Sequence, residues 1–150
     1  MAALAGASMR IIPTKAEEGF RLDLDLLEQQ ITPRCRLLVI NSPGNPSGQV
    51  MTRAEMEALA ALVARHSQLM VMSDEIYEYL LADGQQHCSF AAIAEEIRSR
   101  CFTVNGFAKG WAMTGWRLGY LAGDAAVIKA ASALQSQSTS NVCSLSLIHI

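Results

Sequence analysis

CRLLVINSPGNPSG, residues 35–48, contains the pattern that decides the fold: an unbroken apolar run followed at once by a polar loop rich in proline and glycine. Two later segments share this apolar character, QLMVMS at residues 68–73 and CFTVN at residues 101–105. Strands that are apolar along their whole length are typical of a mostly parallel sheet with helices on both faces. The sequence therefore predicts an α/β fold, a three-layer sandwich.

Helical patterns alternate with these strands, at residues 22–31, 52–66 and 124–137. The second helix has the signature of a capping box in Thr52 and Glu55, and a buried stripe is expected at Met56, Leu59, Ala60 and Val63. Asp124 is the expected N-cap of the third helix.

Two further strands are expected, a short one at residues 9–13 and one at residues 118–122. We predict that the strand at 118–122 runs antiparallel, because only a short connection separates it from the preceding strand and parallel neighbours need a longer crossover.

Composition limits the classes of function. The 150 residues suit one domain, and the net charge of −2 without a Lys/Arg run argues against a nucleic-acid or membrane partner. The apolar runs are shorter than the roughly 20 residues of a membrane span, and the N-terminus lacks a signal-peptide pattern. The four cysteines form no C-x-x-C pair and the three histidines are scattered, which argues against a disulfide framework or a zinc site. We expect reduced thiols and a cytoplasmic location.

Polar residues follow each of the three apolar strands. Asn41 and the loop at 42–48 follow the first strand, residues 73–77 (SDEIY) follow the second, and Asn105 and Lys109 follow the third. Ligands of open α/β sheets bind at the carboxyl ends of the strands. The sequence thus predicts one site that gathers an amide, a carboxylate, a phenol and an amine.

Lys109 differs from an ordinary surface lysine in its context. Lys109 and Arg117 are the only charged residues between positions 101 and 123, and Lys109 has apolar neighbours such as Phe107 and Trp111. A desolvated lysine near a second cation has a lowered pKa and reacts with carbonyl groups. We therefore expect Lys109 to be a desolvated nucleophile.

Three motifs in order carry a family resemblance. Residues 105–120 (NGFAKGWAMTGWRLGY), 41–48 (NSPGNPSG) and 73–77 (SDEIY) resemble the lysine, N-P-x-G and aspartate–tyrosine motifs of fold-type-I aminotransferases, which use pyridoxal 5′-phosphate (PLP). The similarity runs from about residue 8 to 144 and is greatest to the bacterial-type aspartate aminotransferase branch. The resemblance also implies a cis peptide bond before Pro46.

The resemblance implies a role for five residues. Lys109 would bind the cofactor covalently and move the substrate proton, and Asp74 would pair with the pyridine nitrogen. Tyr77 and Asn45 would hydrogen-bond the cofactor's 3′ oxygen, and Arg117 would hold the phosphate. Each residue also has an ordinary structural interpretation when it is considered alone. Lys109 and Arg117 could be surface residues, Asp74 and Asn45 could belong to turns, and Tyr77 could pack in the core.

Other residues of these motifs are expected to be structural. Glu75 is interpreted as a structural carboxylate, and Trp111, Met113 and Trp116 as packing residues rather than cofactor contacts. Ala108 stands where many relatives have a serine, a departure that leaves the lysine chemistry in place.

The resemblance also shapes the expected domain organisation. Residues 1–144 would be part of the PLP-binding large domain, and the small domain and the phosphate loop would lie elsewhere. Residues 145–150 (LSLIHI) match the translation of a sequencing-adapter sequence and are interpreted as a scar. We expect the chain alone to be poorly soluble and inactive, and the parent enzyme to be a homodimer.

The implied activity is transamination between an amino acid, aspartate or a related one, and a 2-oxo acid. Two alternatives share the same fold and stay open at this point: a PLP-dependent C–S lyase or synthase, and the PLP-sensing domain of a transcription regulator.

Overall fold

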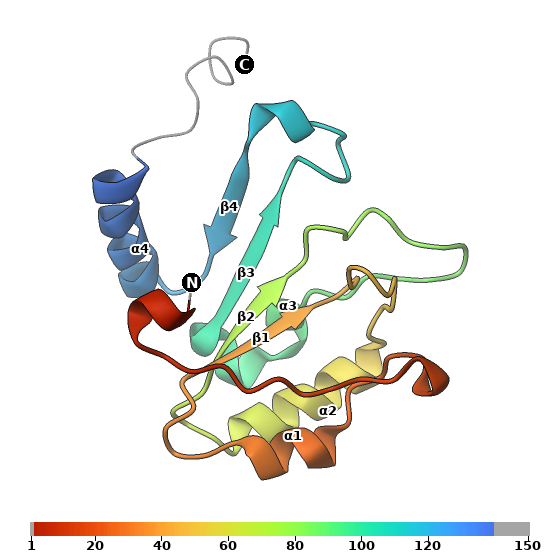
Figure 1. Cartoon of the computed structure of the whole chain (residues 1–150). Helices are drawn as coiled ribbons and strands as arrows, with labels where there is room; N and C mark the ends of the chain where they lie inside the picture. The colour runs from red at the N-terminus through yellow and green to blue at the C-terminus, as the bar shows by residue number, and fades with distance from the viewer. Residues whose placement is uncertain (1, 140–150) are drawn as a thin grey trace.

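The computed structural model describes residues 2–139, which form a single four-stranded sheet with helices packed on it (Figure 1). The strands β1 (Leu37–Asn41), β2 (Met70–Asp74), β3 (Cys101–Gly106) and β4 (Gly119–Ala122) lie side by side in that order. The first three are parallel and β4 is antiparallel to β3. The predicted α/β class, the mostly parallel sheet and the antiparallel fourth strand are confirmed. The interpretation of residues 145–150 as a scar concerns positions outside the described residues.

The helices occupy the connections between strands and the segments around them. They are α1 (Leu24–Gln30), α2 (Arg53–Ala64), α3 (Phe90–Ile93) and α4 (Ala125–Ser138), with 3-10 turns η1 (Ala2–Ala5), η2 (Ala16–Glu18), η3 (Glu95–Arg100) and η4 (Thr114–Trp116). The three predicted helices are confirmed as α1, α2 and α4. The sequence did not reveal α3 and η3, because four to six residues are too few to establish a helical period.

The predicted strand at residues 9–13 is wrong. These residues form no strand, and Met9 and Ile11 are 76% and 80% exposed. An isolated extended segment becomes a strand only when a neighbour completes its hydrogen bonds, and no ladder in the described chain includes this segment.

Local hydrogen bonds explain where the predicted helices begin. The Thr52 hydroxyl accepts from the Glu55 backbone N–H at 3.2 Å, and the Thr52 N–H donates to the Glu55 carboxylate at 2.7 Å. This is the predicted capping box. The Asp124 carboxylate likewise accepts from the N–H of Ala126 at 3.0 Å and begins α4.

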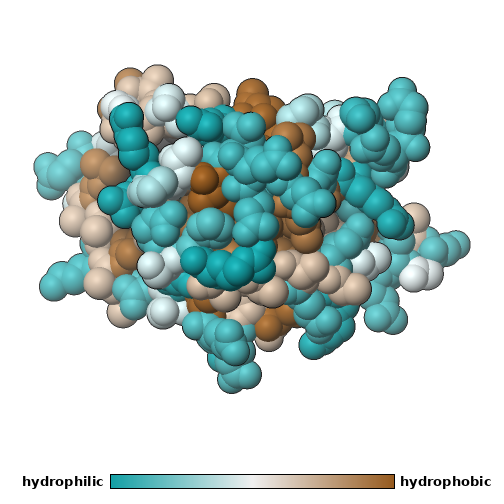
Figure 2. All heavy atoms as spheres, turned by 90° about the horizontal axis from the view of Figure 1, so that it is seen from below, coloured by the Kyte–Doolittle hydropathy of each residue, from teal (hydrophilic) through white to brown (hydrophobic). Residues whose placement is uncertain are grey.

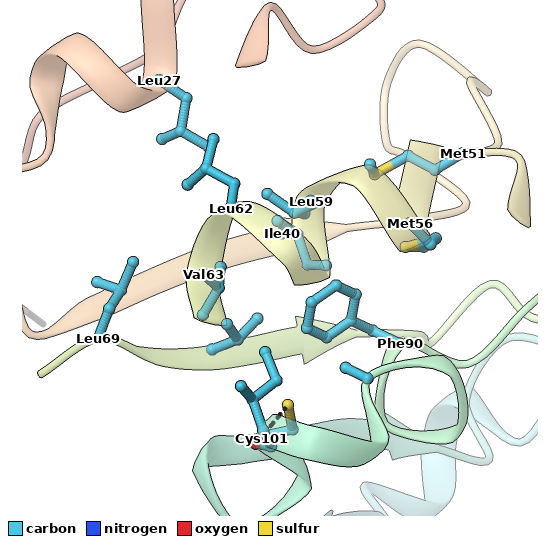
Figure 3. Packing of buried hydrophobic residues seen from close by; sticks show 13 residues of the cluster. Leu27, Ile40, Met51, Met56, Leu59, Leu62, Val63, Leu69, Phe90 and Cys101 are labelled. Carbon is cyan, nitrogen blue, oxygen red and sulfur yellow. Dashed lines mark hydrogen bonds between the residues drawn. The ribbon is translucent and has the colours of Figure 1, made fainter. Parts of the chain in front are cut away.

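The hydrophobic core lies between the helices and one face of the sheet (Figure 3). Met56, Leu59 and Val63 of α2 are fully buried, as predicted, and Leu62 is buried too, whereas Ala60 is only half-buried. They pack in one cluster with residues of the strands and of α3: Ile40, Val71, Cys101 and Phe90. Burial raises the pKa of the Cys101 thiol to about 11, so this thiol stays neutral and behaves as an apolar core group.

The opposite face of the sheet is more open. Leu37 and Val39 of β1 are 50% and 56% exposed, and their registered neighbours Met70 and Met72 are half-buried. Helix α4 has no buried residue. Within residues 2–139, helices therefore cover one face of the sheet. Seen from below, the molecule has a mostly hydrophilic surface with separate hydrophobic patches (Figure 2).

Arg100, next to β3, forms hydrogen bonds to the segment between α2 and β2. Its guanidinium donates to the backbone carbonyls of His66 at 2.8 Å and Leu69 at 2.7 Å. Carbonyls just past a helix C-terminus lack intrahelical partners, and a cation there also interacts favourably with the helix dipole.

We predict that Arg100→Met lowers the free energy of unfolding by about 1–3 kcal/mol, because it leaves these carbonyls without a charged donor. Urea denaturation monitored by circular dichroism measures the change. The matched control is Arg53→Met, which removes an exposed pair with Glu57 and should change stability by less than about 0.5 kcal/mol. Equal effects of the two substitutions would contradict this role.

We also predict that Val39→Lys reduces self-association of the chain. An exposed apolar strand edge invites pairing with another chain, and a lysine on such an edge opposes it. Light scattering after size-exclusion chromatography measures the apparent mass. Leu134→Lys is the control, since Leu134 is 72% exposed but belongs to helix α4 and not to the edge strand β1. An equal decrease in both variants would show that charge alone is responsible.

Candidate active site

The carboxyl ends of β1, β2 and β3 meet at one edge of the sheet, with Asn41 in register with Asp74 and Asp74 with Val104. The Asn41 side chain joins two of the predicted segments there. Its amide nitrogen donates to the Asp74 carbonyl at 3.0 Å, and its oxygen accepts from the Asn45 N–H at 2.9 Å. Asn41 thus holds the loop at 42–48 over the end of β2.

Buried Ser42 fixes the loop, which contains two cis peptide bonds. The Ser42 N–H donates to the Asp74 carbonyl at 3.2 Å, and the Ser42 hydroxyl accepts from the Met51 N–H at 2.9 Å. The bonds before Pro43 and Pro46 are both cis. The predicted cis bond at Pro46 is confirmed, and the one at Pro43 was not foreseen.

Tyr77 is where the three motifs meet. The Asn45 side-chain amide donates to the Tyr77 hydroxyl at 2.9 Å, and the Lys109 amine lies 5.5 Å from the centroid of the Tyr77 ring. The structure therefore brings together an amide, a phenol and an amine from segments that are 32 residues apart in each direction.

Asp74 ends β2 directly beside this group. One of its carboxylate oxygens accepts from the Ile76 N–H at 3.2 Å, which shapes the turn that leads to Tyr77. By strand alternation its side chain shares a face with Met72, opposite the face that buries Val71 and Ser73. Asp74 is half-buried.

Lys109 is exposed, so the predicted desolvation of this lysine is wrong for the described chain. Its loop is held by two backbone bonds, from Ala112 to the Lys109 carbonyl and from Met113 to the Phe107 carbonyl. The apolar neighbours do not cover the amine, because Phe107 and Trp111 are themselves 38% and 59% exposed.

Arg117 is also exposed and lies in the turn before β4 with a positive φ of 54°. Its guanidinium donates to the Thr114 carbonyl at 3.2 Å, within the same turn. Three of the five predicted site residues, Asn45, Tyr77 and Lys109, are therefore in contact. Asp74 lies three residues before Tyr77, at the end of β2. Among residues 2–139, Arg117 has only this local hydrogen bond.

Trp111 packs edge-on against Tyr79, with ring centroids 5.6 Å apart. Gly110 permits this contact, because a Cβ at this position would lie 2.6 Å from the Tyr79 ring. The loop of Lys109 is therefore anchored on the segment that follows Tyr77. The packing role predicted for Trp111 is confirmed, although more than half of its surface stays exposed.

Glu75 is buried, with 1% of its surface exposed. Its carboxylate accepts hydrogen bonds from the hydroxyls of Ser73 and Ser89, at 2.9 and 3.1 Å, and from the Phe90 N–H at 3.1 Å, and it lies 3.1 Å from His87 Nε2. Burial acts to raise the pKa of Glu75, but the hydrogen bonds outweigh burial and hold the pKa below its ordinary value. The predicted structural role of Glu75 is confirmed. Apart from Ser73, its partners lie 12 to 15 residues away, and no spacing rule connects them to Glu75.

Two surface hollows lie away from this edge. One, of about 230 Å³, lies between the start of α1 and the start of α2 and is lined by residues that include Leu22, Met51 and Ala58, and the other runs along α4. Neither is lined by a predicted site residue. Residues 2–139 contain no group of three His, Cys, Asp or Glu side chains that suits a metal ion. In the same range, no helix has the length and apolar character needed to cross a bilayer.

The site at the strand ends thus joins an N-P-x-G loop, an Asp–Tyr turn and a lysine loop. This combination resembles the class I and II aminotransferases, and comparison with known proteins identifies the same family. Residues 1–148 match the family model for aminotransferase class I and II. The chain belongs to this family.

Three similar proteins carry names of aspartate or aspartate/prephenate aminotransferases. The chain is 49% identical over 146 residues to a bifunctional aspartate aminotransferase and glutamate/aspartate-prephenate aminotransferase of Petunia hybrida, covering 97% of the chain and 30% of that protein. It is 47% identical over 132 residues to a probable aspartate/prephenate aminotransferase of Rickettsia bellii, covering 88% and 33%. The structure of Thermus thermophilus aspartate aminotransferase with maleate matches with a TM-score of 0.88 at 43% identity, covering 96% and 36%. The chain thus spans about a third of the length of the relatives it matches.

We predict that Glu75→Gln destabilises the chain by about 1–3 kcal/mol at pH 7, because an amide cannot accept all the bonds that the carboxylate accepts. A carboxyl group with a lowered folded pKa stabilises the protein above its unfolded value, near 4.5, and loses this contribution as the pH falls through the folded pKa. The difference between wild type and variant should therefore shrink as the pH falls below about 4.5.

Urea denaturation at a series of pH values measures this difference. Glu57→Gln, at an exposed carboxylate paired with Arg53, is the control and should show little change at any pH. A Glu75→Gln effect that stays constant between neutral and acid pH would rule out an ionised Glu75 as the source of stability.

Proposed function

We propose that this chain supplies the reactive lysine and part of the cofactor site of a PLP-dependent aminotransferase. The proposed substrates are an amino acid of the aspartate type and a 2-oxo acid. The observation that carries the proposal is the cluster of Asn45, Tyr77 and Lys109 at the carboxyl edge of a parallel sheet. The names of the relatives, aspartate and aspartate/prephenate aminotransferases, support this activity over the C–S lyase and regulator alternatives.

The donor set at this edge suits PLP. An amine, Lys109, is available for the cofactor's aldehyde, and a carboxylate, Asp74, for its pyridine nitrogen. Tyr77 and Asn45 would hold the ring oxygen, and Arg117 would hold the phosphate. When bound, the cofactor supplies a conjugated ring that withdraws electrons from the substrate α-carbon.

The hydrogen bond from Asn45 determines in which direction the Tyr77 hydroxyl can donate. Since the Tyr77 oxygen accepts from the Asn45 amide at 2.9 Å, the hydroxyl hydrogen is free to donate to a second acceptor. A ring oxygen of the cofactor is such an acceptor. Asn45 would thereby fix both the position of the hydroxyl and the direction in which it donates.

Lys109 would act as the proton carrier. Its amine sits at the end of a flexible side chain above the Tyr77 ring, and a neutral amine there would accept a proton from the substrate α-carbon and return it nearby. The cation–π contact places the amine next to the phenol without an ion pair, so the side chain stays free to move.

The remaining parts of the proposal concern the whole protein. We propose that residues 1–144 form part of the PLP-binding large domain, that residues 145–150 are a scar, and that the parent enzyme is a cytoplasmic homodimer. The family match and the coverage of about a third of each relative support the first of these statements.

We predict that Lys109→Ala lowers transamination of aspartate with 2-oxoglutarate by about 10²–10⁴-fold in the complete reading frame that contains this sequence, because the proton carrier is lost. Spectrophotometric assay of oxaloacetate formation measures the rate. Lys129→Ala, at an exposed residue of α4, is the control and should retain activity. Thiol release from cysteine conjugates, without amino transfer, would favour the lyase alternative instead.

A further inference from the structure

Asn105 has a buried side-chain amide whose nitrogen and oxygen both form hydrogen bonds. It is 4% exposed, at the end of β3 and four residues before Lys109. Its nitrogen donates to the Glu78 carboxylate at 2.7 Å, and its oxygen accepts from the Gly106 N–H at 2.7 Å. Both bonds are short, and a hydrogen bond to a carboxylate is stronger than one between neutral groups.

The bond to Glu78 joins two segments of the candidate site that are 27 residues apart. Glu78 directly follows Tyr77, and Gly106 begins the loop of Lys109. Gly106 also lies against the Ile76 side chain of the Tyr77 turn, since a Cβ there would lie 3.2 Å from it. On its other side the same Cβ would lie 2.7 Å from the Leu118 carbonyl, before β4, so there is no room for a side chain at Gly106.

The charge of Glu78 also acts on the neighbouring strand β4. Although burial is the larger cause, the Glu78 carboxylate also helps to raise the pKa of Tyr120, the residue of β4 that pairs with Asn105. The carboxylate therefore lies within electrostatic reach of the strand pair from which the Lys109 loop emerges.

We propose that Glu78 is a positioning residue: by accepting from Asn105, it holds the turn of Tyr77 against the loop of Lys109. The inference rests on the proposed function and adds a residue to it. Without the bond, the turn of Tyr77 loses its hydrogen bond to Asn105, and the backbone of the Lys109 loop loses its fixed position relative to the Tyr77 ring. Misplacement of a reacting group by about 1 Å can cost as much as 10²-fold in rate.

The test uses PLP itself as the probe, in the complete reading frame. PLP is added at the concentration that half-labels wild type, and borohydride then reduces each condensed carbon–nitrogen double bond to a stable amine. Mass spectrometry of the peptides compares labelling at Lys109 with labelling at Lys15 and Lys129, which are exposed and far along the chain. This ratio reports the position of one amine and does not depend on enzyme turnover.

We expect Glu78→Ala to lower the preference for Lys109 by about ten- to a hundredfold, as for a displaced reacting group. Glu78→Gln retains an acceptor for Asn105 and should stay within about twofold of wild type. Glu57→Ala removes an exposed carboxylate from α2 and should have no effect.

A reversed pair separates positioning from a general loss of structure. Asn105→Asp alone places two carboxylates face to face and should lose the preference. Combined with Glu78→Gln, it restores a bond of opposite polarity, since the glutamine amide donates to the aspartate, and the preference should return. Circular dichroism of each variant, recorded alongside, identifies the folded ones, and the reversed pair decides the matter if Glu78→Ala does not fold.

Two outcomes would overturn the inference: a wild-type preference in Glu78→Ala, or no recovery in the reversed pair. A wild-type protein without any preference for Lys109 is a different result, because it would refute the proposed function itself.

Discussion

The burial of α2 against three parallel strands is the constraint on which the rest of the structure depends. Met56, Leu59 and Val63 are fully buried in one cluster with residues of β1, β2 and β3. Because a one-residue slip would turn every strand side chain to the other face, this packing fixes the register. A fixed register makes the strands end together, and the polar residues that follow them consequently meet at one edge.

Much of this arrangement was predictable from the sequence, because its signals are local. Uniformly apolar runs gave β1, β2 and β3, and the Thr52–Glu55 pair gave the start of α2. The placement of Asn45, Tyr77 and Lys109 near one another followed from the order of the strands and from the family resemblance. The short helices after β2, and the open segment at residues 9–13, depend on contacts between distant residues, for which a single sequence carries no periodic signal.

The environment of Lys109 was mispredicted for a related reason. Apolar neighbours in the sequence predict a desolvated amine, yet Phe107 and Trp111 expose much of their surface to solvent. Sequence neighbours in a loop need not cover one another, since cover comes from elements packed over the loop. Residues 2–139 thus fix the relative positions of the phenol, the amide and the amine, whereas they leave the amine in contact with water.

The turn that leaves β2 divides its side chains between two tasks. Asp74 and Tyr77 stand at the sheet edge, where ligands of this fold class bind. Buried Glu75 bonds to the serines and lies beside His87 near α3, and half-buried Glu78 accepts from Asn105 of β3. A carboxylate withdrawn from water must be satisfied by donors, and those donors come from different segments, so each glutamate ties the turn to a different part of the fold. Because the two glutamates bond to different segments on either side of Tyr77, a short, irregular turn can hold a phenol in place between an amide and an amine.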